Sequence, residues 1–545
     1  MLGTRKTVAV HARRFVVVGV FNLLAVGSVL AMDTVVAAEA PADANAPVAF
    51  DLWEFQLKGN TLLPQITIER ALYPFLGPGR TLDDLEKAQS ALEKVYVDAG
   101  YQTVRVDLPQ QEVKEGVVHL KVVEGRVGRT RVSGARYVSA TSIREHLPAL
   151  AEDQVPNLPK VQSELTALNL SSQDYEITPV LRPGKTPGTL EVELKVSDRV
   201  PLHGSLGLNN RYSASTSQLR AEAQLSYDNL WQAMHSLSVQ YQTAPEKPDE
   251  VQVAAATYMM PLGLGSHRLV VYGIDSSSSV ATVGDISVLG KGNIYGVRGV
   301  FPLGSLGANG QGFHSLIFGG DYKSFDETLN LGDSSLERPI SYGLMAIGYS
   351  GQLRSKDRLT RFQLNANLGQ HAFGNEWLEF TNRRVGAKPN FYYLTGSAER
   401  VQPLILGTTI ALKTNFQLAD QPLIGTEQFS AGGVDSVRGY LVSAGLGDRG
   451  VRGSVELRRP ILAGRWPNTL SDSFVRAFVD GAVLSVIDTE PEEIDIYRLA
   501  GSGVGLQTLA FKKLQASLDV GWALREVRET QPGDIQAHFF IEYKF

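Results

Sequence analysis

Apolar and polar residues alternate strictly in many short segments between residues 199 and 545. Segments of about ten residues with a period of two, separated by turn-rich stretches, are typical of the strands of an outer-membrane β-barrel. A soluble β-sandwich also alternates, but charged residues are dense on the polar faces here, which suits a wet lumen and not a dry core. We predict sixteen strands, an even number as bacterial barrels require, beginning near Pro201, Gln218, His235, Glu250, His267, Asn293, Phe313, Ile340, Arg358, Asn390, Thr408, Gly450, Ser473, Tyr497, Lys513 and Gln536.

A different pattern precedes the barrel, because helical and strand periodicities follow one another over residues 53–198. Thr81 with Asp84 three residues later indicates a helix N-terminus, and Gly100 closes that helix. The order β-α-α-β-β occurs over residues 53–125 and again over 126–198. The predicted fold class is therefore two α+β modules followed by a 16-stranded antiparallel transmembrane β-barrel at residues 199–545.

The N-terminal 38 residues have the pattern of a secretory signal peptide. Four basic residues precede an apolar run from Phe15 to Met32, and small residues follow it at 36–38. The alternative is a membrane anchor, because the run is about long enough to span a bilayer. Residues 39–52 are predicted to be a Pro/Ala-rich linker, with order beginning at Trp53. No further apolar run long enough for a spanning helix follows residue 38.

Composition excludes several classes of function. The chain has no cysteine, so a disulfide framework and a thiolate zinc site are impossible. A formal charge of -5 argues against a general nucleic-acid binder. The nine histidines show no familiar metal-ligand spacing, and the G-x-G-x-x-G run at 445–450 leads into a strand and not a helix. We predict no catalytic site, no cofactor and no metal, and hence no enzyme.

The connection over residues 420–449, between the eleventh and twelfth strands, is the longest candidate for a functional loop. A loop of this length inside a strand-rich chain is uncommon unless it is functional or disordered. This one carries Phe429, Val434 and Leu441, with glycines at positions where the backbone must turn tightly. We expect it to fold into the barrel, where Arg438 reaches a carboxylate on the wall.

Three stretches resemble a known family. The loop matches the sixth-loop motif of the POTRA-bearing barrel superfamily at Val437, Arg438, Gly439 and Tyr440. The thirteenth strand resembles the second motif of that superfamily, whose aspartate pairs with the loop arginine, at Phe478, Val479, Asp480 and Gly481. The stretch from Tyr175 to Asp198 looks like the second POTRA domain of the two-partner secretion transporters (the TpsB family, of the ShlB/FhaC/HecB type).

The resemblance implies a protein translocase in the Gram-negative outer membrane, with two POTRA domains in the periplasm. These domains would capture an unfolded exoprotein, a large β-helical adhesin, haemolysin or toxin of the TpsA type, by strand addition at an open sheet edge. The barrel would contact outer-membrane lipid. A terminal aromatic, Phe545 with Tyr543, is usual for substrates of the barrel-assembly machinery. The class of cargo and the oligomeric state stay open.

Three other functions compete with export. An assembly factor for other barrels usually carries more than two POTRA domains, a passive diffusion porin has no reason to carry residues 53–198, and a soluble adhesin would not need charged inner faces. Family members commonly carry an N-terminal plug helix, but residues 39–52 are too short and Pro/Ala-rich for a stable one. We therefore expect the resting pore to be closed mainly by the loop.

The predicted pair of Arg438 with Asp480 is a latch only if it is buried. A fully wet ion pair contributes about 0–1 kcal/mol. Beneath the loop, loss of one partner would cost about 3–5 kcal/mol, because the other charge is stranded. The opposing interpretation is a surface arginine in a flexible loop.

Overall fold

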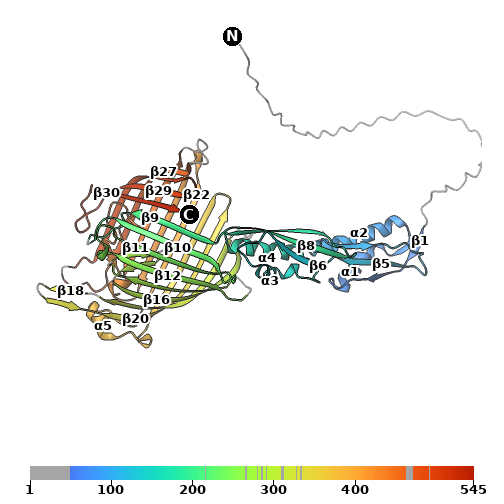
Figure 1. Ribbon diagram of the computed structural model, residues 1–545, viewed down its shortest axis with the longest axis horizontal. Coiled ribbons are helices and arrows are strands. Elements are labelled where there is room, and N and C mark those ends of the chain that lie inside the picture. The colour runs from blue at the N-terminus through green and yellow to red at the C-terminus, as the bar shows by residue number, and fades with distance from the viewer. Residues whose placement is uncertain are drawn as a thin grey trace, which may run out of the picture.

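The computed structural model describes residues 49–545 except 215, 264–266, 279, 284–285, 290, 308–311, 327, 332–333, 462–469, 490 and 492. Two small modules lie in line and lead into a barrel (Figure 1). The predicted signal peptide, and linker residues 39–48 with any plug helix, lie outside the described residues. Among the described residues, no helix is long and apolar enough to cross a membrane.

The first module begins earlier than predicted, because β1 lies within the expected linker and pairs with β3. The predicted capping box forms, with the Asp84 carboxylate accepting from the Thr81 amide at 3.0 Å. Tyr96 is fully buried, and burial raises the pKa of its phenol to about 12, so it donates as a neutral group to Asn60 Oδ1 at 2.6 Å. The elements are β1 Phe50–Leu52, β2 Glu54–Lys58, α1 Gln65–Leu72, β3 Gly77–Arg80, α2 Leu82–Asp98, β4 Val104–Asp107 and β5 Val117–Glu124.

The second module repeats this plan. Its sheet has the order β6-β8-β7, which corresponds to β2-β5-β4 in the first module. In both sheets the first strand runs parallel to the central strand and the other edge strand runs antiparallel to it. The predicted order β-α-α-β-β is confirmed in the second module, and the first module has the same order with the extra pair β1 and β3 added. The elements are β6 Arg126–Ser133, α3 Ala140–Glu145, α4 Leu158–Ser171, β7 Tyr175–Pro183 and β8 Thr189–Asp198.

Sixteen strands of the described chain close into an antiparallel barrel, each beginning within three residues of its predicted start. The first and last strands pair from Asn209 with Phe540 to Ser205 with Lys544, so the sheet has no free edge. The barrel strands are β9 Leu202–Asn209, β10 Arg220–Leu230, β11 His235–Thr243, β12 Gln252–Pro261, β13 Arg268–Ser276, β16 Lys291–Leu306, β17 Gly312–Asp326, β20 Ile340–Ser355, β21 Arg358–Gly369, β22 Phe391–Pro403, β23 Thr409–Ala419, β26 Arg449–Pro460, β27 Leu470–Ser485, β28 Ile496–Ala510, β29 Leu514–Ala523 and β30 Ile535–Lys544.

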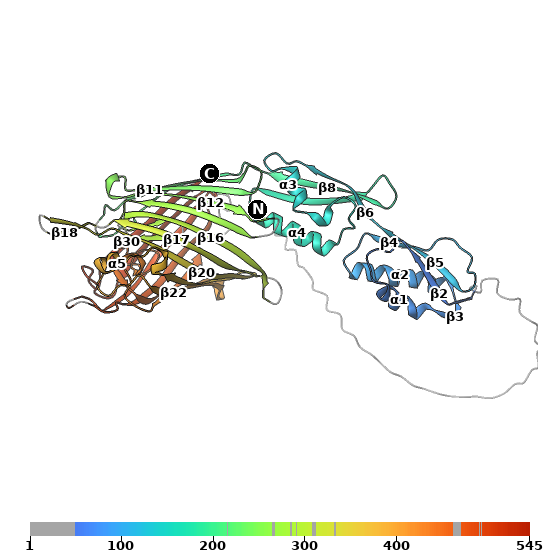
Figure 2. The ribbon, with the colours of Figure 1, turned by 90° about the horizontal axis from the view of Figure 1, so that it is seen from below.

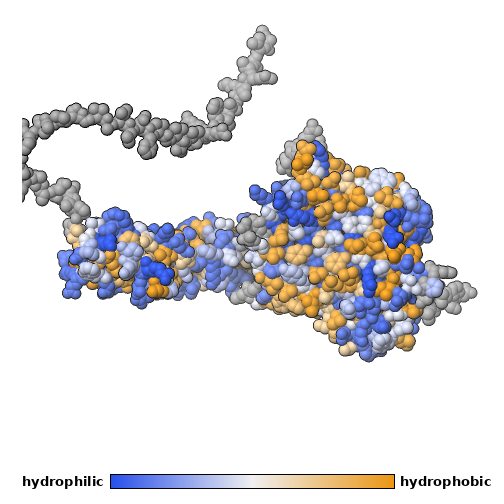
Figure 3. All heavy atoms as spheres, turned by 180° about the vertical axis from the view of Figure 1, so that it is seen from behind, coloured by the Kyte–Doolittle hydropathy of each residue, from blue (hydrophilic) through white to orange (hydrophobic). Residues whose placement is uncertain are grey.

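The outer wall of the barrel is apolar. Leu225, Val479 and Val504 are each at least half exposed, and Figure 3 shows hydrophobic residues spread over the barrel while the modules are largely hydrophilic. Tyr543 and Phe545 are also exposed, and their rings stack with centroids 6.3 Å apart at the seam beside β9. Alternation of the strands therefore separates an apolar outer face from a polar lumen.

The barrel end far from the modules carries further elements. In Figure 2, β18 and α5 lie at this end, opposite the two modules. The connection from β21 to β22 contains α5, and the connection from β23 to β26 spans residues 420–448, because β26 begins at Arg449. The additional elements are β14 Val280–Val283, β15 Ile286–Leu289, β18 Thr328–Leu331, β19 Ser334–Glu337, α5 Trp377–Arg383, β24 Phe429–Ala431 and β25 Gly445–Gly447.

Candidate functional site

The long loop at residues 420–448 folds inward against the wall formed by β26 to β29. Its two arms pair as β24 and β25, and the tip turns where the Ser436 amide donates to the Gly433 carbonyl at 3.1 Å. Gly433 has φ of +92° and Gly439 of +101°, a backbone region that residues with a side chain rarely adopt. The tip places Arg438 at the wall, where its side chain is only 4% exposed.

Arg438 and Asp480 form a two-point ion pair. Arg438 Nε lies 2.7 Å from Asp480 Oδ2, and Nη2 lies 2.8 Å from Oδ1. The Arg438 amide also donates to Asp480 Oδ2 at 3.1 Å. Asp480 stands on β27 and its side chain has no exposed surface. Two parallel charge-assisted hydrogen bonds fix the orientation of the guanidinium as well as its position, so the predicted pair forms with bidentate geometry.

The remaining donors of Arg438 are also satisfied by the wall. Nη1 bonds to Glu456 Oε1 at 2.7 Å and Nη2 bonds to Ser454 Oγ at 3.0 Å, both on β26. The guanidinium carbon lies 3.4 Å from the centre of the Phe478 ring, close enough for stacking and a cation–π interaction. Asp480 and Phe478, both predicted as partners of the loop, thus hold Arg438 together with two residues that the sequence did not indicate.

Acidic and basic side chains around the Arg438–Asp480 ion pair are equal in number. Asp519 lies 3.8 Å from Arg438 Nη1 and itself forms a two-point pair with Arg476, both distances being 2.6 Å. Arg458 bonds to Glu456 at 2.7 Å. Three guanidinium groups therefore face three carboxylates. Gly505 makes room for this network, since a Cβ there would lie 1.8 Å from Asp519 Oδ1.

The other motif residues of the loop hold the tip by packing. Val437 and Tyr440 are buried in an apolar cluster with wall residues of β27 and β28. The Tyr440 hydroxyl lies 2.8 Å from the Arg525 carbonyl and 3.2 Å from the Arg525 amide. At Gly439 a Cβ would lie 2.8 Å from the backbone of Trp522, so the chain approaches the wall too closely for a side chain.

Gly481, named by the resemblance, has no such constraint. A Cβ there would meet only the Leu499 carbonyl oxygen, at 3.8 Å, which is ordinary contact. Nothing in the structure requires glycine at this position.

The sequence did not reveal a second anchor, at the base of the loop. The fully buried Asp448 carboxylate forms a two-point pair with Arg384, at 2.5 and 3.0 Å. It also accepts from the amides of Leu423 and Ile487, at 2.9 and 2.7 Å, and from Gln428 Nε2 at 3.2 Å. Because Arg384 follows α5, the anchor ties together the connections after β21, β23 and β27.

Glu427 is a second buried carboxylate of the loop, besides Asp448. It accepts from Lys323 Nζ at 2.6 Å and from the hydroxyls of Tyr342 and Tyr393, at 2.5 and 2.6 Å. These partners stand on β17, β20 and β22, which lie three to six strands from β27 in the order of the barrel. No local pattern marks Glu427 or Asp448, because their partners come from strands and loops remote in sequence.

An apolar cap fills the far end of the lumen. It consists of Phe380 and Ala387 from the connection after β21, and Leu423 and Ile424 from the loop, buried against inward-facing strand residues such as Tyr342. Two connections therefore contribute to the cap, whereas the sequence pointed mainly to the loop.

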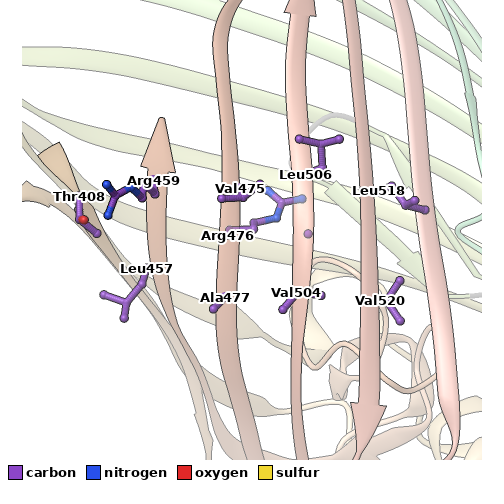
Figure 4. A pocket seen from close by; sticks show the side chains of 11 residues that line it. Thr408, Leu457, Arg459, Val475, Arg476, Ala477, Val504, Leu506, Leu518 and Val520 are labelled. Carbon is purple, nitrogen blue, oxygen red and sulfur yellow. The ribbon is translucent and has the colours of Figure 1, made fainter. Parts of the chain in front are cut away.

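A shallow hollow of about 530 Å³ lies across β26 to β29 (Figure 4). Its lining is almost entirely apolar and includes Leu457, Val475 and Val504, which have the outward parity of the strands and are exposed. The hollow faces the membrane side of the wall, and its polar lining residues are Thr408, Arg459 and Arg476, with no carboxylate or histidine among them. The site of interest is therefore the loop and its partners.

Comparisons with known proteins fit this architecture. The profile of the ShlB-type POTRA domain matches residues 50–125, and that of the haemolysin secretion/activation protein ShlB/FhaC/HecB matches residues 188–298 and 342–508, just over half of the chain. The outer membrane transporter CdiB of Dickeya dadantii (strain 3937) is 25% identical over 508 residues, covering 91% of this chain and 87% of that protein.

Solved structures share the fold. CdiB from Escherichia coli superimposes with a TM-score of 0.66 at 20% identity, covering 93% of both chains. CdiB from Acinetobacter baumannii gives a TM-score of 0.57 at 16% identity, covering 92% of this chain and 91% of the other.

These observations define an outer-membrane β-barrel transporter with N-terminal POTRA-type modules and a loop held inside the lumen. The chain belongs to the haemolysin secretion/activation family ShlB/FhaC/HecB. It is accordingly an outer-membrane transporter of two-partner secretion and not an enzyme. Its family exports haemolysin- and adhesin-type exoproteins.

Proposed function

We propose that this transporter exports one large, unfolded exoprotein of the haemolysin, adhesin or toxin class, and that the Arg438–Asp480 pair latches the loop in the lumen between export events. The supporting observation is a fully buried, two-point ion pair that joins a loop to the barrel wall. A buried pair that loses one partner strands a charge at about 3–5 kcal/mol. The latch is therefore strong while closed, and a polar chain entering the lumen can release it by offering substitute partners.

The apolar cap supports the same mechanism. Phe380 and Ile424 come from different connections but pack into one buried cluster. A polypeptide leaving through the far end must separate these connections, and Asp448 bonded to Arg384 holds them together. Export then requires two events: the Arg438–Asp480 ion pair must break, and the two connections of the apolar cap must separate.

Capture of the exoprotein by strand addition needs an open edge, and two of the four edges in the modules are already occupied. On β4, the Val106 amide donates to Glu93 and its carbonyl accepts from Gln89, both on α2. On β7, the Ile177 amide and carbonyl bond to the Asn169 side chain on α4. Side chains that occupy edge groups blunt the edge against further pairing.

The other edges of the two three-stranded sheets, β2 and β6, are more open to strand addition. Among the described residues, β2 pairs only with β5. We place the captured segment of the exoprotein along β2, and along β6 beyond Val127. The Val127 amide already donates to the Gln154 carbonyl, and its carbonyl accepts from the Asp153 amide. Backbone pairing there would give affinity without strict demands on sequence.

Site-specific photocrosslinking tests the capture site. A photoreactive residue at exposed Gln56 on β2 should crosslink to the exoprotein in secreting cells, and one at exposed Arg105 on β4 should not. Crosslinks from position 105 alone would show that the exoprotein is captured at β4 and not at β2. Crosslinks from neither position would remove the first module from the capture step.

A further inference from the structure

Three side chains with metal-binding atoms converge where the second module joins the barrel. Asp174 directly precedes β7, His203 is the second residue of β9, and Asp228 lies near the end of β10. His203 Nε2 is 2.8 Å from Asp174 Oδ2 and 3.6 Å from Asp228 Oδ2. One ligand atom from each of the three residues lies within 4.8 Å of the other two.

The backbone fixes these three positions relative to one another. The Asp228 amide donates to the Pro201 carbonyl at 2.8 Å, and the Arg199 amide donates to the Asp174 carbonyl at 2.9 Å. His203 is the cross-strand partner of residue 226, so Asp228, two residues later, has the same parity as His203. The cluster is thus assembled by the main chain and does not depend on flexible ends.

Electrostatics leave the cluster short of positive charge. Arg199 Nε bonds to Asp174 Oδ1 at 2.9 Å, which orients the carboxylate and turns Oδ2 toward His203. In the described part of the chain, His203 is the sole basic group within 4.0 Å of Asp228. With a neutral imidazole, two carboxylates and one guanidinium leave a net charge of -1, in a site where the Asp174 side chain is only 4% exposed.

We propose that Asp174, His203 and Asp228 bind a divalent cation of the zinc type, which links the second module to the barrel. Zinc bonds of about 2.0–2.2 Å in tetrahedral geometry separate neighbouring ligand atoms by about 3.3–3.6 Å. The separation of His203 Nε2 from Asp228 Oδ2, 3.6 Å, falls at the end of that interval, and the 2.8 Å hydrogen bond from His203 to Asp174 must lengthen by about 0.5 Å to admit the ion. An imidazole ligand favours zinc over magnesium or calcium, which take oxygen ligands.

Two of the three proposed ligand side chains are accessible to solvent. The side chains of His203 and Asp228 are 35% and 41% exposed, so a water molecule has room at the fourth position and the ion has a path of entry. Arg199 acts as the outer-shell group that orients the Asp174 carboxylate. Since one ligand belongs to the module and two belong to the barrel, the bound ion restricts the angle between them, and with it the direction in which a captured chain meets the lumen.

The test uses the full chain without a polyhistidine tag, purified in detergent and stripped with a chelator. Cobalt(II) is titrated as a spectroscopic probe and zinc is titrated by calorimetry. The proposal predicts one equivalent of each metal and the intense visible bands of tetrahedral cobalt(II). His203→Ala and Asp228→Asn should each weaken zinc binding by more than the roughly 10- to 100-fold that follows loss of an outer-shell partner.

His314→Ala is the matched control, because His314 also lies near the module end of a barrel strand but bonds to the Tyr349 hydroxyl. It should bind zinc like the native chain. No binding by the native chain, or equal binding by the His203 and Asp228 variants, overturns the proposal. Heat-modifiable migration in gels, compared across the variants, confirms that each barrel is folded, so loss of binding is not loss of structure.

Discussion

Arg438→Ala is the most stringent test of the proposed latch between the loop and the barrel wall. The substitution removes four side-chain hydrogen bonds to Asp480, Glu456 and Ser454, and leaves the fully buried Asp480 carboxylate with only the amide of residue 438. Stranding a buried charge costs about 3–5 kcal/mol. At about 1.4 kcal/mol per factor of ten, the ratio of docked to released loop should fall by about two to three and a half orders of magnitude.

Cysteine labelling measures that ratio directly, because the native chain has no cysteine. Ser436→Cys places one thiol at the loop tip, at a position that is 8% exposed when the loop is docked. Its rate of labelling by a membrane-impermeant maleimide should rise by the same factor when Arg438→Ala is added. Secretion should fall while the barrel stays inserted.

Arg458→Ala is the control, because the contacts of Arg458 within the described residues are to the wall, an ion pair with Glu456 and a cation–π contact with Phe474. Labelling at position 436 should change little in that variant. An unchanged labelling rate in Arg438→Ala would refute the latch, since the loop would then be held by packing alone.

Three further outcomes follow from the same contacts. Gly439→Ala should release the loop tip, because the added Cβ would lie 2.8 Å from the wall backbone, and labelling of the Ser436→Cys thiol should therefore be faster. A labelling rate equal to that of the native loop would show that the wall backbone moves to accommodate the Cβ. Asp448→Asn should leave the Arg384 charge without its carboxylate and lower the free energy of unfolding in urea by about 3–5 kcal/mol, whereas Asp420→Asn, at an exposed position, should not. Equal urea midpoints for the two variants would show that the Asp448–Arg384 pair does not anchor the loop. Deletion of Phe545 should lower the amount of assembled barrel, read by heat-modifiable migration, and an undiminished yield would argue against a terminal assembly signal.

The strands were predictable because the barrel imposes a strict physical rule along the chain. Each strand separates lipid from a wet lumen, so its residues alternate over its whole length, and every start was located within three residues. The modules were predictable for a related reason, since Thr81 with Asp84 marks a helix start locally. The error at β1 arose because a three-residue strand is too short to show a period.

The candidate site was predictable only in part. Two motifs predict the pairing of Arg438 with Asp480. The contacts of Glu456 and Ser454 instead depend on the register of β26 against β27, which no local pattern encodes. Asp448 with Arg384 joins loops separated by more than sixty residues. His203 and its two aspartates escaped detection for the same reason, because 25 to 29 residues separate consecutive members and no ligand spacing appears in the sequence.

The central claim is that this chain exports one dedicated exoprotein. The most direct test compares the proteins of the cell surface and culture medium in strains of the native host with and without this gene. Loss of a single large polypeptide from outside the cell, restored by the native chain but not by Arg438→Ala, is the predicted result. A joint decrease of many outer-membrane proteins would instead indicate a barrel-assembly factor and would contradict the account.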